Sequence, residues 1–276
     1  MEQASTEPHV PAPLGHVEPH AGLLRVPDDG QSLYKVTTVE NLLRSMMGNY
    51  LHFNRVDSYA DFPGVDAHDG QQLPEDRPAN ANAWFQRAPE FSVADYYDQS
   101  RARSYAFCVS LENSAHIWAN YGNGSAMGRV CLVFSFGKLR ARLNQMLQPG
   151  NAALLYNDVQ CHQVFSVNYS IVDYVDWKTY RANTKVLPNP IRYTYLKDAQ
   201  FSGEKELRIS LSTFGIGSFA LNDGTMMEFA PSLQLAFDFK AAMTDGTIQR
   251  VLLSPGTDAT SLTAELYKLR IVAMQG

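Results

Sequence analysis

The sequence is short of charged residues and of cysteine, and it contains no long apolar run. Charged residues make up only 18 % of the 276 positions, and 28 Asp and Glu outnumber 23 Lys and Arg, which gives a net charge of −5. No surplus of cations is available to neutralise phosphates, so we expect no broad nucleic-acid-binding surface. Apolar runs such as Val130–Phe134 have the length of a strand, far below the ~18 residues of a membrane helix, so no membrane partner is expected.

Cysteine is too scarce and too scattered for a disulfide framework. Cys108, Cys131 and Cys161 are odd in number and lie far apart, and no Cys and His cluster has zinc spacing. We therefore expect buried free thiols, no metal site and a reducing compartment. Because no basic segment followed by an apolar stretch begins the chain, a cytoplasmic location is expected, with export by a non-classical route left open.

Several phosphate-binding and nucleophile motifs are missing. The sequence has no GxGxxG opening a helix, no GxxxxGK[ST] and no GxSxG, so Rossmann, P-loop and serine-hydrolase chemistry lack their motifs. Gly122, Gly124 and Gly128 precede a strand rather than a helix, which favours a hairpin turn.

The composition changes after about residue 30. Residues 1–30 are rich in Pro and His and show no hydrophobic period, so they predict a disordered leader. The remainder, 31–276, predicts a single α+β domain, because 45 % hydrophobic residues suffice for a large core and the elements do not alternate regularly. The expected strands are 33–36, 50–53, 105–111, 128–136, 160–164, 167–172, 207–211, 233–239 and 248–253, and the expected helices are 39–47, 84–103, 114–121, 138–147 and 261–269.

The most informative segment is Glu204-Lys205-Glu206-Leu207-Arg208. If it is a strand, Glu204, Glu206 and Arg208 share one face. Two readings remain open. The segment is a solvated edge strand, or it is a carboxylate pair in a cleft that holds a sugar hydroxyl, stabilises an oxocarbenium ion or deprotonates a nucleophile.

Motifs in the same order resemble a widespread bacterial family of unknown function. Its members share a Leu-Tyr-Lys start, a Phe-Asn-Asp-Pro turn, a Trp-x-x-Tyr helix before a Gly-Val strand, and a Glu-Lys-Glu-x-Arg strand. The matching segments here are Leu33–Lys35, Trp118–Tyr121, Gly128–Phe134 and Glu204–Arg208, whereas Tyr59–Pro63 departs from the turn.

More distantly, the order of elements resembles the ADP-ribosyltransferase fold. The resemblance implies a split mixed or antiparallel β-sheet flanked by helices, with NAD as substrate and an unknown protein or nucleic-acid acceptor. Mapped onto this sequence, the early strand carries Tyr34 and Lys35, the middle strand Ser110, and the late strand Glu204 and Glu206. Lys35 stands where one clade has Arg, and Lys lacks the planar bidentate contact of Arg.

The same resemblance implies roles for these residues. Glu206 would bind the ribose 2′-hydroxyl and stabilise its positive charge, Glu204 would orient or deprotonate the acceptor, and Ser110 would brace Glu206 or the ribose. Trp118 and Tyr121 would stack on nicotinamide or belong to the core, and Arg208 would pair with the carboxylates or a phosphate. The function implied is ADP-ribosyl transfer or NAD hydrolysis by a toxin, effector or defence protein.

Two other functions remain possible from the sequence. One is a non-catalytic binding or immunity-type module, for which Glu204 and Glu206 would be solvated on an edge strand. The other is a metal-dependent nuclease that uses Asp57, Asp61 and the two glutamates, against which the lack of a basic surplus counts.

Overall fold

The computed structural model has an α+β fold built on a mainly antiparallel sheet. It describes residues 17–61, 66–85, 88–147, 154–156, 159–161, 165–182, 190–213, 218–220 and 226–268. The main sheet has ten strands, and every pairing within it is antiparallel. These strands are β1 (Ser32–Thr38), β2 (Tyr50–Arg55), β5 (Ser104–Ser110), β6 (Arg129–Ser135), β7 (Leu154–Tyr156), β8 (Val159–Cys161), β9 (Phe165–Ile171), β12 (Glu206–Thr213), β15 (Ser232–Ala236) and β16 (Ile248–Leu253).

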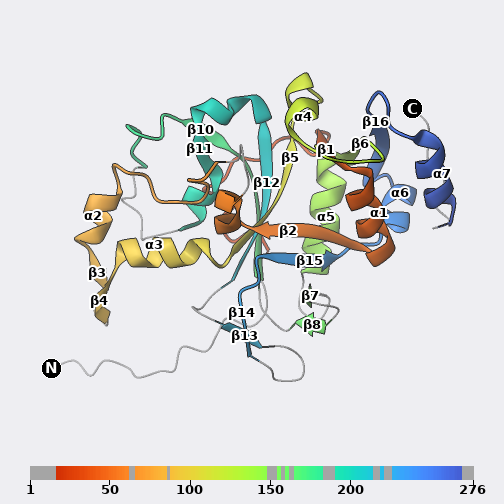
Figure 1. Cartoon of the computed structure of the whole chain (residues 1–276). Coiled ribbons are helices and arrows are strands. Elements are labelled where there is room, and N and C mark those ends of the chain that lie inside the picture. Colours follow the sequence, from red (N-terminus) through yellow and green to blue (C-terminus); the bar gives the residue numbers. More distant parts are fainter. Residues whose placement is uncertain are drawn as a thin grey trace.

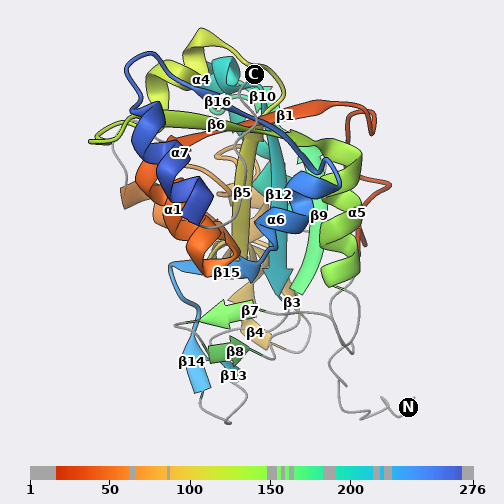
Figure 2. The same ribbon diagram turned by 90° about the vertical axis from the view of Figure 1, so that its right-hand side faces the viewer.

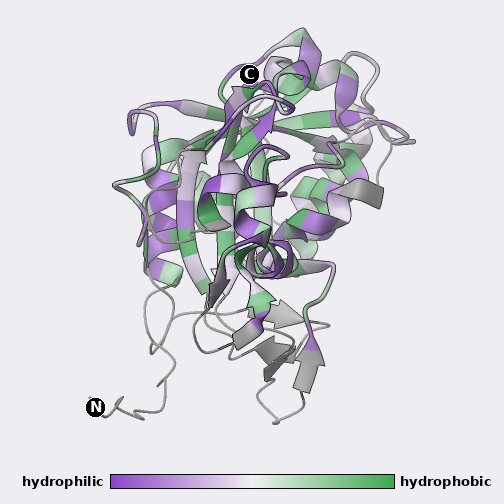
Figure 3. Ribbon diagram, turned by 90° about the vertical axis from the view of Figure 1, so that its left-hand side faces the viewer, coloured by the Kyte–Doolittle hydropathy of each residue, from purple (hydrophilic) through white to green (hydrophobic). Residues whose placement is uncertain are grey.

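Helices cover the sheet from both sides. The α-helices are α1 (Val39–Gly48), α2 (Arg77–Ala81), α3 (Val93–Arg101), α4 (Ala115–Asn120), α5 (Phe136–Met146), α6 (Phe239–Thr244) and α7 (Ala259–Lys268). Helices α1, α5, α6 and α7 lie against one face, as Figures 1 and 2 show, and α2 and α3 lie on the opposite side (Figure 1). Hydrophobic residues gather on the strands between these layers, whereas loops carry much of the hydrophilic sequence (Figure 3). The core is therefore the interior of a layered structure.

The remaining elements are short. They are the 3-10 helices η1 (Val56–Asp61), η2 (Pro190–Tyr195) and η3 (Ala199–Glu204), and the two-stranded sheets β3 (Trp84–Phe85) with β4 (Ala88–Ser92), β10 (Asp173–Val175) with β11 (Leu196–Asp198), and β13 (Ser218–Ala220) with β14 (Met226–Glu228). The β10–β11 pair is parallel.

The main sheet branches at β5. Along one edge β5 pairs with the whole length of β12, from Glu206 opposite Ser110 to Ser212 opposite Ser104. Along the other edge it pairs with β1 only at Ser110 and with β2 only at Ala106 and Tyr105. The middle of β5, residues 107–109, has neither of these two neighbours on that edge. The backbone groups exposed there need another partner, and this gap positions the site described below.

The start of α1 illustrates how the sequence sets local structure. Thr38 has an extended backbone, and its Oγ1 accepts a hydrogen bond from the N–H of Asn41 at 3.0 Å. The helix ends where Asn49 adopts a left-handed conformation with φ 50°. These are ordinary N- and C-terminal caps, and they confirm the helix expected over 39–47.

The region 84–103 differs from its expected helix. It contains β3 and β4 before α3 begins at Val93. The helix starts there because Ser92 and Asp95 form a reciprocal capping box, with 3.1 Å and 2.9 Å hydrogen bonds between side chains and backbone. The aromatic residues Trp84, Phe85 and Phe91 that suggested helix lie before this start.

Residues 17–31 also differ from a disordered leader. Val17 forms a parallel bridge with Val167, and Glu18 receives 2.6 Å hydrogen bonds from Arg140. The N–H of Ile171 donates to the carbonyl of Arg25 at 2.7 Å. This segment therefore runs along the outer edge of β9, while residues 1–16 lie outside the described part of the chain.

Among the described residues, no helix is long and apolar enough to span a bilayer.

Candidate functional site

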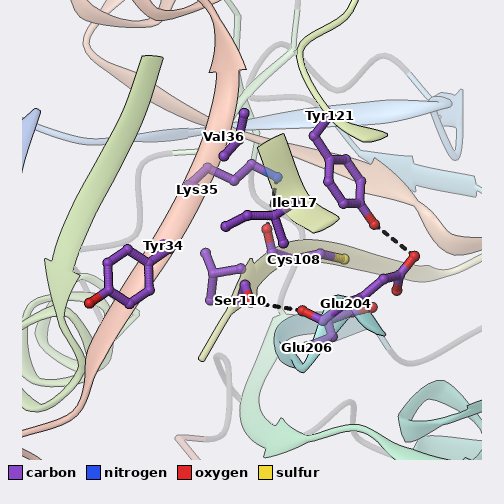
Figure 4. A pocket seen from close by; sticks show the side chains of 10 residues that line it. Tyr34, Lys35, Val36, Cys108, Ser110, Ile117, Tyr121, Glu204 and Glu206 are labelled. Atoms are coloured by element: carbon purple, nitrogen blue, oxygen red, sulfur yellow. Dashed lines mark hydrogen bonds between the residues drawn. The ribbon is translucent and has the colours of Figure 1, made fainter. Parts of the chain in front are cut away.

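A small pocket of about 50 Å³ opens where β1 leaves β5. Segments far apart in the sequence meet at it: two strands of the branched sheet, helix α4, and the junction between η3 and β12 (Figure 4). Its lining residues are Tyr34, Lys35, Val36, Cys108, Val109, Ser110, Ile117, Tyr121, Glu204 and Glu206.

Three neighbouring strands bring residues of this pocket to one level. Tyr34 of β1 lies opposite Ser110 of β5, and Ser110 lies opposite Glu206 of β12. Six residues predicted from the sequence line the pocket: Tyr34, Lys35, Ser110, Tyr121, Glu204 and Glu206. The ring of Tyr34 nevertheless lies away from the carboxylates (Figure 4), so Tyr34 forms a wall rather than a contact to them.

The two glutamates meet by a different backbone path from the one expected. Glu204 ends η3, Lys205 has a left-handed φ of 47°, and β12 begins at Glu206. The alternation rule for a strand therefore does not apply between them. Ser110 fixes this turn, because its Oγ donates a 2.7 Å hydrogen bond to the carbonyl oxygen of Glu204.

The solvated edge-strand interpretation is wrong. Strand β12 is flanked by β5 and β9, and Glu204 and Glu206 are only 8 % and 4 % exposed. Buried carboxylates require compensating partners, so their surroundings decide what they can do.

Lys197 of β11 is the shared partner of both carboxylates. Its Nζ lies 2.6 Å from Oε2 of Glu204 and 3.4 Å from Oε2 of Glu206, and the residue is 3 % exposed. Burial alone would lower the pKa of Lys197, but the charges of Glu206, Asp69 and Glu204 outweigh burial and raise it. The ammonium group is thus permanently charged.

Arg208 binds the carboxylate of Glu206 on the side away from the pocket opening, within the buried core. Its Nε donates a 2.7 Å hydrogen bond to Oε1 of Glu206, as the shared face of residues two apart on a strand predicts. Its two terminal nitrogens bind the carboxylate of Asp69 at 2.5 Å and 2.8 Å, and one also donates to the carbonyl of Thr194 at 2.7 Å. Arg208 is fully buried and does not line the pocket. It therefore positions Glu206 and is not available for a substrate phosphate.

Tyr121 closes the network from α4. Its hydroxyl donates a 2.7 Å hydrogen bond to Oε1 of Glu204, and the residue is 37 % exposed at the pocket (Figure 4). The chain turns away directly afterwards at Gly122, whose φ is +69°. A Cβ on Gly122 would lie 3.0 Å from the backbone of Thr37, so this turn needs glycine. Gly124 and Gly128 also have positive φ, but the turn joins α4 to β6 and is therefore not the hairpin expected from the sequence.

The two carboxyl groups differ in pKa. Burial would raise the pKa of Glu206, but the adjacent charges of Arg208 and Lys197 outweigh it and hold the pKa well below its ordinary value. Burial raises the pKa of Glu204, and the attraction of Lys197 opposes it only in part. Two carboxyl groups with opposite shifts can divide the work of charge stabilisation and proton transfer.

Lys35 has a mainly structural environment. Its Nζ donates a 2.8 Å hydrogen bond to the carbonyl of Cys108, in the gap where β5 lacks a strand neighbour, and lies 4.9 Å from the ring centre of Phe107. Burial lowers the pKa of Lys35, against the raising effect of the charges on Cys108 and Glu206. Lys35 thus adds positive charge beside the pocket and replaces a missing backbone donor.

Trp118 does not join the pocket. Its ring packs against Val36, Ile117 and Cys131, and its Nε1 donates a 2.7 Å hydrogen bond to Asn113. Stacking of Trp118 on nicotinamide stays a prediction, and the position of the ring fits the alternative as a packing residue. His116 is exposed beside Gly203, where a Cβ would lie 2.8 Å from the imidazole.

Sequence reasoning missed Lys197, Asp69 and Cys108. Lys197 stands alone in Leu196-Lys197-Asp198, and Asp69 lies in the polar segment His68-Asp69-Gly70. Neither has a spacing that signals a site.

The nuclease alternative finds no support among the residues described. They contain no group of three or more His, Cys, Asp or Glu side chains that could hold a metal ion. Asp57 is instead paired with Arg55 at 2.5 Å, and the side chain of Asp61 lies outside the described part of the chain.

Comparison with known proteins identifies no relative: no family model, no curated protein and no solved structure matches the chain.

Proposed function

We propose that this pocket cleaves the bond between nicotinamide and ribose in NAD and transfers ADP-ribose to an acceptor or to water. The observation that carries the proposal is the convergence of Ser110, Glu204 and Glu206 on one pocket, with the ammonium group of Lys197 beneath the two carboxylates. The resemblance of the order of elements to the ADP-ribosyltransferase fold, with Glu204 and Glu206 mapped to its late strand, adds support.

The chemistry requires a negative charge beside the ribose. When the N-glycosidic bond breaks, its electron pair leaves with nicotinamide and positive charge develops on the ribose ring. Glu206 remains ionised because Arg208 and Lys197 hold its pKa low, so its carboxylate can stabilise that charge. The acceptor oxygen or nitrogen then forms the new bond to the ribose carbon.

Glu204 suits proton transfer from the acceptor. Burial raises the pKa of Glu204 above its ordinary value, and Glu204 is the more exposed of the two carboxyl groups. The hydrogen bond from Tyr121 orients one oxygen and leaves that oxygen a second lone pair for the acceptor proton. Ser110 acts indirectly, by fixing the carbonyl of Glu204.

Nicotinamide release from NAD tests the proposal. The wild-type chain is expected to release nicotinamide, and Glu204→Gln is expected to lower the rate about a hundredfold or more, the usual contribution of a general base. Glu206→Gln should be at least as damaging. Glu112→Gln is the matched control, because the side chain of Glu112 is exposed and does not line the pocket, and only its backbone N–H contacts Ser110.

Loss of folding must be separated from loss of chemistry. Removing a buried charge next to Arg208 or Lys197 is destabilising, so each variant is checked by its melting temperature and circular dichroism. Wild-type chain without nicotinamide release, or folded glutamine variants with an unchanged rate, would contradict the proposal.

A further inference from the structure

A second, larger cleft lies between α1, β1 and β2. Its volume is about 400 Å³, and it shares Lys35, Val36 and Tyr121 with the carboxylate pocket. The two spaces are therefore contiguous. A volume of this size suits a ligand with several rings or groups.

The branching of the sheet creates this cleft. Strands β1 and β2 contact β5 only at its opposite ends, so they separate between those contacts. Helix α1 follows β1 directly and presents Asn41, Arg44 and Ser45 to the space. These positions share one face of a helix because they are three and four residues apart.

The charge of the cleft has one sign. Of the described residues that line it, none is Asp or Glu, although the whole chain has a net charge of −5. Its titratable basic groups are Lys35 of β1, Arg44 of α1 and His52 of β2. Desolvation lowers the pKa of His52, and the nearby positive charges of Lys35 and Arg44 lower it further against a hydrogen bond with Asn54. Lys35 and Arg44 thus bring positive charge to the cleft, and the carboxylates Glu204 and Glu206 belong to the adjoining pocket.

Arg44 is the group best placed to bind an anion. Its side chain is exposed and forms no ion pair or hydrogen bond with any other described residue. The guanidinium group therefore keeps all its donors for a ligand, and it matches the geometry of phosphate oxygens. The side chains of Asn41, Ser45 and Asn123 line the same cleft and offer hydroxyl and amide groups.

We propose that this cleft binds a nucleoside diphosphate, with its phosphates held at Arg44 beside Lys35 and its uncharged part along the amide, hydroxyl and aromatic groups of the cleft. The site depends on Arg44 and the face of α1, not on the carboxylates Glu204 and Glu206. Binding at this cleft and cleavage at the carboxylate pocket can therefore fail independently.

Calorimetric titration of the full chain with ADP, inorganic pyrophosphate and adenosine tests the site. ADP and pyrophosphate are expected to bind, more weakly as salt rises, and adenosine at least about tenfold more weakly than ADP. Arg44→Ala should weaken ADP binding about tenfold or more, because it removes a charged donor to phosphate. Arg250→Ala, which removes an exposed arginine of β16 outside both pockets, is the matched control and should bind ADP as the wild type does.

A second variant, Asn41→Asp, adds a negative charge with little change in the shape of the side chain. Asn41→Asp places a carboxylate in the cleft, so ADP binding should fall while adenosine binding stays unchanged. The proposal is overturned if the wild type binds neither ADP nor pyrophosphate at millimolar concentration, if adenosine binds as tightly as ADP, or if Arg44→Ala and Arg250→Ala have equal effects. Glu204→Gln should retain ADP binding even when nicotinamide release is lost, which separates this site from the proposed catalysis.

Discussion

Lys197 places its ammonium nitrogen 2.6 Å from Oε2 of Glu204, and both side chains are almost completely buried. The same nitrogen lies 3.4 Å from Glu206, so one cation serves two carboxylates. Breaking a buried pair costs more than forming it gains, because the remaining charge is left without a partner.

Lys197→Met is expected to lower the free energy of unfolding by about 3–5 kcal/mol, since it strands two buried carboxylates. Adding Glu204→Gln to this variant should recover part of the loss, because it removes one stranded charge. Urea denaturation of the two single variants and the double variant measures the coupling. Additive losses would show that Lys197 and Glu204 do not interact.

The ion pair between Asp69 and Arg208 should be much more important for stability than a surface pair of similar geometry. Both side chains are 1 % exposed, and the contact is bidentate. Asp69→Asn removes the charge and turns an amide donor towards the guanidinium group, so we expect a loss of about 3 kcal/mol or more. Asp173→Asn breaks the exposed pair with Arg25, whose side chains are 64 % and 55 % exposed, and should cost no more than about 1 kcal/mol. Equal losses of unfolding free energy in urea would contradict the buried network.

Much of the secondary structure could be predicted from the sequence, because local patterns determine it. Val39–Gly48 carries a helical period between Thr38 and Asn49 as caps, and Ile248–Leu253 is the strand expected there. The β3–β4 hairpin was missed because aromatic residues were taken as helical, although Ser92 and Asp95 mark the true helix start.

The composition of the site was only partly predictable, for a physical reason. Glu206 and Arg208 are two apart on one strand, so their contact follows from alternation. Asp69 lies 139 residues from Arg208 in the sequence, whereas Lys197 is seven positions from Glu204 and meets it across the 3-10 helix η3. The first contact depends on tertiary packing and the second on a turn, and neither leaves a spacing signal in a single sequence.

The stability of the chain should depend on pH in opposite ways through the two glutamates. The folded-state pKa of Glu206 is lowered from its ordinary value of 4.5, so its contribution is present above about pH 4.5 and is lost as pH falls. The pKa of Glu204 is raised, so its contribution is full below about pH 4.5 and is lost as pH rises through the raised value. Unfolding free energies measured between about pH 3 and 8 should therefore lose acid sensitivity in Glu206→Gln. Relative to the wild type, Glu204→Gln should gain stability as pH rises.

Tyr121→Phe isolates one hydrogen bond to Glu204. Because this bond favours the ionised carboxylate, its removal should raise the pKa of Glu204 further. If Glu204 acts as the base in NAD cleavage, the acidic limb of the pH–rate profile for nicotinamide release should move to higher pH. The unfolding free energy should fall by about 1.5 kcal/mol, the usual contribution of a hydrogen bond to a charged group. Tyr267→Phe, at a tyrosine 77 % exposed, is the control, and a profile in Tyr121→Phe identical to that of wild type would exclude Glu204 as the base.

The thiols of Cys108 and Cys131 should be chemically inert in the folded chain. Burial raises the pKa of each to about 12, and for Cys108 the charge of Glu206 adds to the effect. Only the thiolate attacks an alkylating reagent, so at pH 8 about one thiol in ten thousand is reactive at any moment. Mass spectrometry of peptides after iodoacetamide treatment should find both residues unmodified in the native chain and alkylated in urea. Rapid native alkylation of Cys108 would show that the pocket admits solvent and reagent to the thiol. That result would contradict the water-excluded surroundings inferred for Glu206. It would also remove the basis for the role of Glu206 in stabilising a positively charged ribose.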